Sequence, residues 1–242
     1  MQVNADTGMK NKSKIQNPKS KICLTIAGLD PSGGAGIVAD IKTFTAFGCF
    51  ATAAITSITF QNTTGVFGAI HQTAESVRGQ IEPIIEDFTV AALKTGMLPT
   101  SEIIEETWRI VKGNNLKNFV VDPVVRSTSG FDLIDDEALQ SLIKNLFPLA
   151  DVITPNLPEA ERIARLKIET KKDLEKAARI MQDFGAKNVL IKGGHLFEGE
   201  RRKAKMKSKT ERQLIIYLPA MICVFLKLNL SKPPPRMEQA AH

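Results

Sequence analysis

The chain has 242 residues and a mass of 26.5 kDa, which suits a single α/β domain. Its apolar content of 43% and charged content of 24% are those of a globular protein and exclude a disordered one. The net charge of +6 is unevenly placed, because residues 1–21 carry +4, residues 201–242 carry +8 and residues 22–200 carry −6. A nucleic-acid-binding domain bears its positive charge on a folded face, so this distribution argues against nucleic acid as a partner.

The cysteines and histidines are too scattered to build a structural site. Cys23, Cys49 and Cys223 form neither a disulfide framework nor a Cys-x-x-Cys metal pair. The three histidines stand singly, which excludes a histidine-based zinc site. Residues 1–21 are polar and basic, without the apolar segment of a secretory signal. We therefore expect a flexible basic leader over residues 1–21 and a cytoplasmic protein.

Short apolar runs alternate with helical patterns from residue 22 to about residue 200. Strands are predicted at 22–27, 51–60, 90–94, 119–121, 151–154 and 188–192. Helices are predicted at 37–47, 73–88, 100–112, 135–147, 156–166 and 171–184, with a break or bend at Pro83. The alternation predicts one α/β domain with a mostly parallel sheet covered by helices on both faces.

This rhythm is lost after Glu200. A run of basic residues is followed by the apolar segment 214–226, which Pro219 interrupts. Its 13 residues are fewer than the roughly 20 that span a bilayer, so we expect no membrane anchor. Residues 201–242 are interpreted as a divergent basic and apolar tail.

A glycine-rich loop, Gly28-Leu-Asp-Pro-Ser-Gly-Gly-Ala-Gly36, links the first strand to the first helix. Such a loop can present backbone N–H groups to a ligand. It is not a Walker A loop, because no Lys-Ser/Thr pair follows the glycines. Residues 34–39 match the relaxed dinucleotide-binding pattern, but the second strand ends in Gln61 and Asn62 instead of the acidic residue that this pattern requires. A turn that only packs strand against helix is the remaining alternative.

Unusual residues follow the strands, where ligands of open α/β sheets bind. Asp40, early in the first helix, either interacts with the helix dipole or accepts hydrogen bonds from a ring amine or hydroxyl. Gln61 offers an acceptor and a donor, which suits the edge of a heterocycle. The strand ends also carry Gly28, Gly96-Met97, Asp122-Pro-Val124 and Thr154-Pro-Asn156.

Asp122 and Glu159 are the best candidates for a cation site, because Mg²⁺ prefers oxygen ligands and often takes one or two carboxylates. Glu159 also lies in the first turn of a helix opened by Asn156, where an acid is ordinary. Lys192 ends a strand before two glycines, and is either a phosphate ligand or a solvated lysine. His195 is interpreted as structural.

Taken together, these motifs resemble a known family. Residues 25–44, Thr-Ile-Ala-Gly-Leu-Asp-Pro-Ser-Gly-Gly-Ala-Gly-Ile-Val-Ala-Asp-Ile-Lys-Thr-Phe, resemble the opening of the hydroxymethylpyrimidine/phosphomethylpyrimidine kinases of thiamine biosynthesis. These kinases belong to the ribokinase superfamily, as do pyridoxal kinases. The motifs at 61–66, 94–98, 121–124, 153–160 and 190–196 follow in the family's order, so the resemblance covers about residues 22–196.

The resemblance implies a ribokinase-like three-layer α/β/α fold and a homodimeric kinase that uses ATP and Mg²⁺. The substrates would be 4-amino-5-hydroxymethyl-2-methylpyrimidine and then its monophosphate. By motif position, Asp122 and Glu159 would serve the metal, and Asn156 and Lys192 would lie near the ATP phosphates. The residues around the pyrimidine would be Gly28, Asp40, Gln61, Met97 and Val124.

The sequence departs from the family after residue 196. The family continues to a Thr-His-Gly-Thr-Gly-Cys-type motif whose backbone N–H groups stabilise the transferring phosphate, but no Gly-x-Gly occurs in residues 197–242. Cys223 has no neighbouring glycine, so no catalytic residue is assigned. We therefore expect a kinase domain over residues 22–200 that is incomplete at its C-terminus, with residues 201–242 either shifted out of the family's reading frame or otherwise replaced. A pyridoxal kinase and a non-catalytic pyrimidine-binding protein are the alternatives, and Gln61 and Met97 favour the pyrimidine over pyridoxal.

Overall fold

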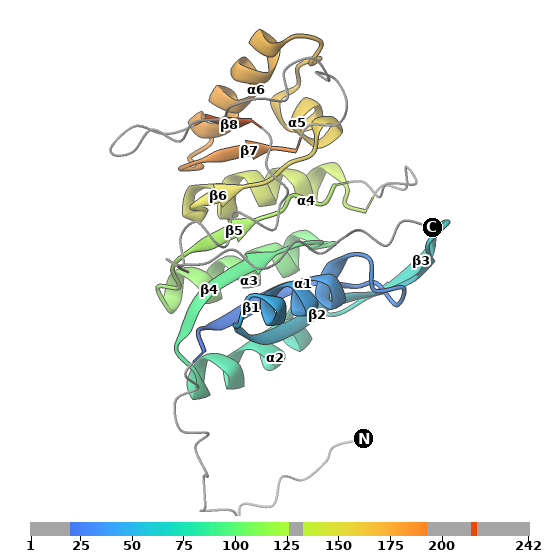
Figure 1. Ribbon diagram of the computed structural model, residues 1–242, viewed down its shortest axis with the longest axis vertical. Coiled ribbons are helices and arrows are strands. Elements are labelled where there is room, and N and C mark those ends of the chain that lie inside the picture. Colours follow the sequence, from blue (N-terminus) through green and yellow to red (C-terminus); the bar gives the residue numbers. More distant parts are fainter. Residues whose placement is uncertain (1–19, 126–132, 193–213, 217–242) are drawn as a thin grey trace, which may run out of the picture.

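The computed structural model describes residues 20–125, 133–192 and 214–216 (Figure 1). Residues 1–19 of the predicted leader, His195, Cys223 and most of residues 201–242 therefore lie outside the described residues. The strands form one sheet in the order β3-β2-β1-β4-β5-β6-β7-β8, in which only the β2–β3 pair is antiparallel. The strands are β1 (Ile22–Leu29), β2 (Phe50–Asn62), β3 (Gly65–His71), β4 (Val90–Thr95), β5 (Phe119–Val121), β6 (Val152–Ile153), β7 (Val189–Ile191) and β8 (Leu214–Ile216).

The helices follow the predicted rhythm closely. The predicted helix 135–147 is the one that differs in kind, because it changes into a π turn (Leu142–Leu146) and a 3-10 turn (Phe147–Leu149). The α-helices are α1 (Gly36–Ala46), α2 (Ala74–Asp87), α3 (Ser101–Gly113), α4 (Asp136–Ser141), α5 (Leu157–Ala164) and α6 (Lys171–Asp183).

The predicted break or bend at Pro83 is contradicted as a break, whereas the bend stays a prediction. Helix α2 runs through Pro83 and ends at Asp87. Its buried residues Val77 and Ile81 pack into the main core, and the Thr73 hydroxyl caps its first turn by accepting a hydrogen bond from the Ser76 N–H. Tertiary packing therefore outweighs the one backbone hydrogen bond that proline removes.

Strand β3 was not predicted. It pairs antiparallel with the end of β2, and the Asn62 side chain holds the turn between them by accepting hydrogen bonds from the N–H groups of Thr64 and Gly65. The hairpin exposes large apolar side chains on both of its strands. Its sequence therefore lacks the alternation of apolar and polar residues that indicates a half-buried strand. Its most exposed members are Phe60, Phe67 and Ile70.

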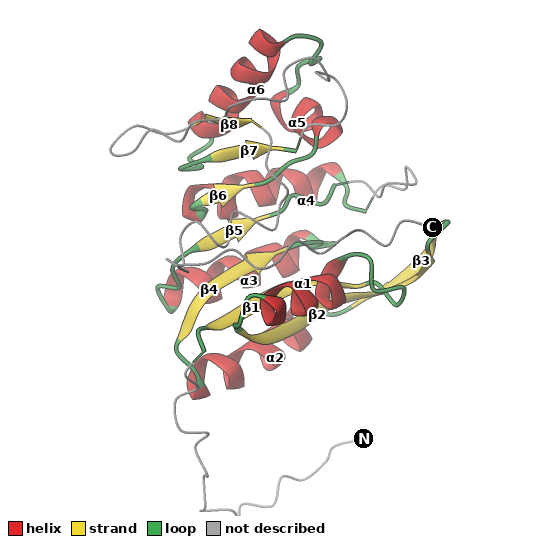
Figure 2. Ribbon diagram, viewed as in Figure 1, coloured by secondary structure: helices red, strands yellow, loops and turns green. Residues whose placement is uncertain are grey.

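Helices cover the sheet on opposite faces, which makes the predicted three layers (Figure 2). Residues that alternate along β1 belong to different cores, since Leu24 and Ile26 join the main cluster whereas Cys23 joins a small cluster with Phe44 of α1. Helices α2, α3 and α4 contact one another in succession, and α1 packs on β1 and β2. Helix α1 therefore lies on the face opposite the main core.

The strand order places a topological switch between β1 and β4. The connection from β1 passes through α1 to β2 on one side, whereas the chain continues from β4 to β5 on the other side. Where the connections from two adjacent strands run to opposite sides in this way, a ligand-binding crevice forms at the carboxyl ends of the strands. Within the described residues, no helix is long and apolar enough to cross a membrane.

Strand β8 lies in the region that the sequence assigned to the tail. Leu214, Ile215 and Ile216 pair in parallel with Val189, Leu190 and Ile191 of β7. Three residues after the basic run therefore extend the sheet. The proposed domain boundary at residue 200 remains a prediction.

Candidate active site

Asp30 organises the glycine-rich loop. Its Oδ1 accepts hydrogen bonds from the N–H and hydroxyl of Ser32, both at 2.7 Å, and its Oδ2 accepts from the N–H groups of Gly34 and Ala35 at 3.1 and 2.9 Å. Burial raises the pKa of Asp30, but these hydrogen bonds outweigh burial and leave its pKa below the usual value. The sequence predicted that N–H groups of this loop are available to a ligand. Those of Gly34 and Ala35 instead donate hydrogen bonds to Asp30.

The loop brings α1 against the end of β1. Gly36 has a φ of +56°, and a Cβ at this position would lie 2.1 Å from the carbonyl oxygen of Gly28. Only glycine permits this approach. The glycines of the loop therefore set the position of α1, and with it the position of Asp40.

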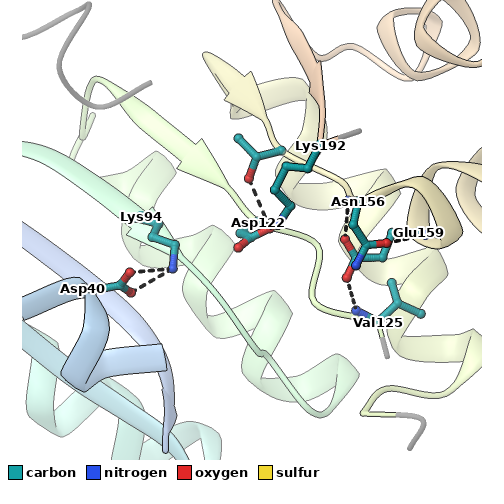
Figure 3. A network of polar contacts seen from close by, with 8 residues as sticks. Asp40, Lys94, Asp122, Val125, Asn156, Glu159 and Lys192 are labelled. Atoms are coloured by element: carbon teal, nitrogen blue, oxygen red, sulfur yellow. Dashed lines mark hydrogen bonds and ion pairs between the residues drawn. The ribbon is translucent and has the colours of Figure 1, made fainter. Parts of the chain in front are cut away.

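Asp40 is held in an ion pair with Lys94 of β4 (Figure 3). The Lys94 Nζ lies 2.8 Å from both carboxylate oxygens, and the Thr25 hydroxyl donates to Oδ2 at 2.6 Å. The side chains of Asp40 and Lys94 are only 14% and 15% exposed. Asp40 lies in the second turn of α1, whose first turn holds no acid, so the helix-dipole interpretation is wrong.

Gly28 and Met97 lie together at the switch between β1 and β4. A Cβ at Gly28 would be 3.3 Å from the Met97 sulfur and 3.8 Å from Cβ of Ser57. The Thr56 hydroxyl donates to the Met97 carbonyl oxygen at 2.6 Å and fixes the loop after β4. The buried Met97 side chain and the bare backbone of Gly28 form an apolar wall there.

Gln61 lies at the end of β2 and is tied to the end of β1. The Thr59 hydroxyl oxygen lies 2.8 Å from the Gln61 Oε1 and 2.9 Å from the carbonyl oxygen of Leu29, and its single proton can be donated to either acceptor. Gln61 is therefore linked to the β1 end through Thr59. Val124 lies on the loop after β5, and its N–H donates to the carbonyl oxygen of Asp122.

A second ion pair joins the ends of β5 and β7. The Lys192 Nζ donates to the Asp122 Oδ1 at 2.7 Å, and the Thr154 hydroxyl donates to the same oxygen at 3.1 Å. A hydrogen bond from the Lys192 N–H to the Pro155 carbonyl oxygen, at 2.7 Å, keeps Lys192 beside the loop that leads into α5. Figure 3 shows this pair on the same sheet edge as the Asp40–Lys94 pair.

Glu159 is buried beneath this second ion pair, with 3% of its surface exposed. Its carboxylate accepts from the N–H groups of Asn156 at 2.7 Å and Val125 at 3.3 Å, and the Asn156 side chain in turn caps α5 by accepting from the Glu159 N–H. Burial and the nearby Asp122 charge raise the pKa of Glu159 to about 7, although these hydrogen bonds and the Lys192 charge oppose the rise.

The structure therefore gathers the nine candidate residues at the carboxyl ends of the strands, in two groups. Asp40, Gly28 and Met97 lie at the β1–β4 switch, and Gln61 is connected to it through Thr59. Asp122, Asn156, Glu159 and Lys192 lie at the ends of β5, β6 and β7, and Val124 is on the loop after β5.

Sequence reasoning missed the roles of Asp30 and Lys94. Asp30 has a local signal, because an acid two residues before a Ser-Gly-Gly turn is a common partner of the turn's N–H groups. Lys94 has no local signal, since its partner Asp40 is 54 residues away in sequence. The parallel pairing of β1 with β4 and the packing of α1 on β1 together bring the two side chains into contact.

Comparisons with known proteins agree with this architecture. A family model described as "Phosphomethylpyrimidine kinase" matches residues 30–216. A hydroxymethylpyrimidine/phosphomethylpyrimidine kinase from Haemophilus influenzae is 45% identical over 175 residues, which cover 72% of this chain and 65% of that protein. The chain thus spans slightly less than two thirds of the length of such relatives.

Solved structures show the same likeness. The crystal structure of a phosphomethylpyrimidine kinase from Clostridium difficile is 47% identical, with a TM-score of 0.68, over 73% of this chain and 76% of that one. A pyridoxal kinase from Staphylococcus aureus, solved with AMP-PCP and pyridoxal, is 36% identical with a TM-score of 0.67, over 75% of this chain and 65% of that one. The chain belongs to the phosphomethylpyrimidine kinase family.

Proposed function

We propose that the protein is a kinase that transfers the γ-phosphoryl group of ATP to 4-amino-5-hydroxymethyl-2-methylpyrimidine, and then to its monophosphate. One observation carries this proposal. The Asp40–Lys94 pair and the Asp122–Lys192 pair lie on one sheet edge, so a neutral heterocycle and an anionic nucleotide can meet there. Family membership supports the same reaction.

The pyrimidine would bind at the β1–β4 switch. Met97 and Gly28 supply an apolar wall for a flat ring, and Asp40 supplies an acceptor for an amine or hydroxyl. Gln61 would pair with the ring edge, and Val124 would close the pocket from the loop after β5. These five residues are the substrate-binding set that we propose.

ATP and Mg²⁺ would bind at the ends of β5, β6 and β7. Burial and then the Asp122 charge raise the pKa of Glu159, and a divalent cation between the two carboxylates would offset the repulsion between them. The oxygen donors fit Mg²⁺, which takes one or two carboxylates together with waters and phosphates. When bound, the ion would neutralise charge on the ATP phosphates. Lys192 and Asn156 would lie beside those phosphates.

We further propose a cytoplasmic homodimer that binds neither nucleic acid nor membranes. The exposed apolar side chains of the β2–β3 hairpin support an interface between two copies, because Phe67 is 70% exposed and Ile70 is 56% exposed on an edge strand. The net charge of −6 over residues 22–200 supports the absence of a nucleic acid partner.

A non-catalytic pyrimidine-binding protein is the second candidate. The observation in its favour is that residues 197–242 contain no Gly-x-Gly. Loss of a single N–H donor to a developing anion reduces turnover by about 10²–10³-fold. We therefore expect a slow kinase, with ligand affinities less affected than the rate.

The test combines binding and turnover. Calorimetry should show binding of the pyrimidine and of ATP with Mg²⁺, and liquid chromatography should show the phosphorylated pyrimidine. The Asp122→Asn variant should lose product formation, while Asp136→Asn, at a surface ion pair where Asp136 is 90% exposed, should not. Pyrimidine binding without product would support the second candidate. Faster phosphorylation of pyridoxal than of the pyrimidine would favour a pyridoxal kinase.

A further inference from the structure

Lys94 is the one charged side chain of the two ion pairs to which the proposed function gives no task. Along β4, successive side chains point to opposite faces of the sheet. Leu93 belongs to the main core, whereas Lys94 points to the opposite face and meets Asp40 of α1. A lysine in this half-buried position loses solvation, which its two contacts of 2.8 Å to Asp40 replace.

The hydrogen bonds between Asp40, Lys94 and Thr25 do not use every donor and acceptor position of the ion pair. A carboxylate has about four acceptor positions, and three of those on Asp40 are filled by Lys94, which takes two, and by the Thr25 hydroxyl. The lysine ammonium has three donors, of which two are used. Within the described part of the chain, the pair therefore leaves one further acceptor, on the Asp40 Oδ1, and one further donor, on the Lys94 Nζ, for a ligand.

The backbone beside the pair is bare. A Cβ at Gly96 would lie 2.9 Å from Cβ of Ala27 and 3.6 Å from the Lys94 Nζ. Glycine at this position thus keeps the space next to the ammonium free of a side chain. Met97, the wall of the proposed pyrimidine pocket, is the next residue along the chain.

We propose that Lys94 is a positioning and specificity-determining residue of the pyrimidine site, an inference that rests on the proposed function. Its ammonium fixes the Asp40 carboxylate in one orientation, and the pair then recognises a donor that stands beside an acceptor. On the substrate, these are the amino group, which donates to Asp40, and either the neighbouring ring nitrogen or the hydroxymethyl oxygen, which accepts from Lys94.

The experiment measures dissociation constants by calorimetry for the pyrimidine and, separately, for ATP with Mg²⁺. The variants are Lys94→Met, Asp40→Asn and the double variant. Lys187→Met is the matched control, because Lys187 forms a 3.0 Å ion pair with Asp151 at the opposite ends of the strands and is 62% exposed. Urea unfolding of each variant reports whether it folds.

We expect Lys94→Met to weaken pyrimidine binding by about 10-fold or more, the range of a charge-assisted hydrogen bond, and ATP binding by less than about twofold. Because Lys94 and Asp40 hold each other in place, the two substitutions should not act independently, and the double variant should bind the pyrimidine more tightly than the product of the two single effects predicts. The double variant also removes both buried charges, so it remains informative if either single variant fails to fold. Lys187→Met should bind both ligands as the unmodified protein does.

Two analogues identify the group that Lys94 contacts. If the contact is to the hydroxymethyl oxygen, the affinity difference between the unmodified protein and Lys94→Met should be smaller for the analogue without that hydroxyl than for the pyrimidine itself. If the contact is to the ring nitrogen, this analogue should still distinguish the two proteins. The analogue without the amino group should lose its dependence on Asp40.

The proposal is overturned if Lys94→Met weakens pyrimidine and ATP binding equally, or if the two substitutions multiply their effects in the double variant. It is also overturned if pyrimidine binding is unchanged in Lys94→Met. Absence of product with the unmodified protein would count against the kinase but would leave this comparison of affinities intact.

Discussion

The pKa of Glu159 gives the protein a stability that depends on pH in an unusual direction. In the absence of divalent cations, burial and the Asp122 charge raise this pKa from 4.5 to about 7. Most carboxylates in proteins stabilise the folded state as the pH rises, because their pKa is lowered on folding. Glu159 should do the opposite, and Glu159→Gln removes its titration while keeping its size.

The sign and the magnitude follow from linkage. Between pH 4.5 and pH 7 the folded protein holds a proton on Glu159 that the unfolded chain has released, so the free energy of unfolding falls as the pH rises. Below pH 4.5 both states hold the proton, so the stability that comes from Glu159 is fully present. Above pH 7 both states have released it, and that stability is lost. At 1.36 kcal/mol per pH unit, a pKa of about 7 corresponds to a loss of about 3 kcal/mol.

Urea unfolding of the unmodified protein and of Glu159→Gln, each at pH 5 and pH 8 in EDTA, measures this loss. The two Glu159 carboxylate oxygens accept from the N–H groups of Val125 and Asn156. In Glu159→Gln an amide NH₂ replaces one of these oxygens and faces an N–H group, which lowers the stability of the variant at both pH values. The difference between the two proteins should nevertheless shift by about 2–3 kcal/mol in favour of Glu159→Gln from pH 5 to pH 8. A difference that stays constant within about 0.5 kcal/mol would refute the reasoning.

Substitutions at three further positions test the local geometry. Gly36→Ala should cost about 3 kcal/mol or more and weaken pyrimidine binding, because the added Cβ would meet the Gly28 carbonyl oxygen at 2.1 Å on a backbone with a φ of +56°. Thr95→Val should raise the free energy of unfolding by about 1 kcal/mol, since the buried Thr95 hydroxyl has no hydrogen-bond partner within the described part of the chain. Asn156→Ala should cost about 1 kcal/mol by removing the cap of α5, and Asn156→Asp should restore most of it. Urea unfolding measures all three.

Each of these expectations has a clear contrary result. Gly79→Ala is the control for Gly36→Ala, because Gly79 lies within α2 and its added Cβ would meet no atom within 4 Å. Equal stabilities of the two glycine variants would contradict the steric argument. A loss of stability in Thr95→Val would show that the hydroxyl has a partner, and unchanged stability in Asn156→Ala would mean that the capping box contributes nothing.

Much of the fold could be predicted from the sequence, because its parallel strands are short apolar runs bounded by loop residues. The predicted strand 119–121 matches β5, and the predicted helix 171–184 matches α6 to within one residue. Strand β3 and its pairing with the predicted strand β2 could not be predicted, since Phe67 and Ile70 are apolar without being buried. The continuity of α2 through Pro83 also depends on packing that a local pattern does not contain.

The site shows the same division. Sequence motifs located the strand ends, because Gly28 is the penultimate residue of β1, Asp122 directly follows β5 and Asn156 directly precedes α5. The partners of these residues come from distant segments, and Lys192 reaches Asp122 across 70 residues. The raised pKa of Glu159 likewise depends on burial, which only the folded chain creates.

The central claim is that the Asp122 end of the sheet edge carries phosphoryl transfer to a pyrimidine bound at the Asp40 end. The most direct measurement is a time course of the phosphorylated pyrimidine by ³¹P NMR, with saturating ATP and Mg²⁺, for the unmodified protein and for Asp122→Asn. We expect slow formation of the phosphomonoester by the unmodified protein, and a rate lower by about 10²-fold or more in Asp122→Asn. Binding of both ligands with no phosphomonoester, or equal rates for the two proteins, would contradict the claim.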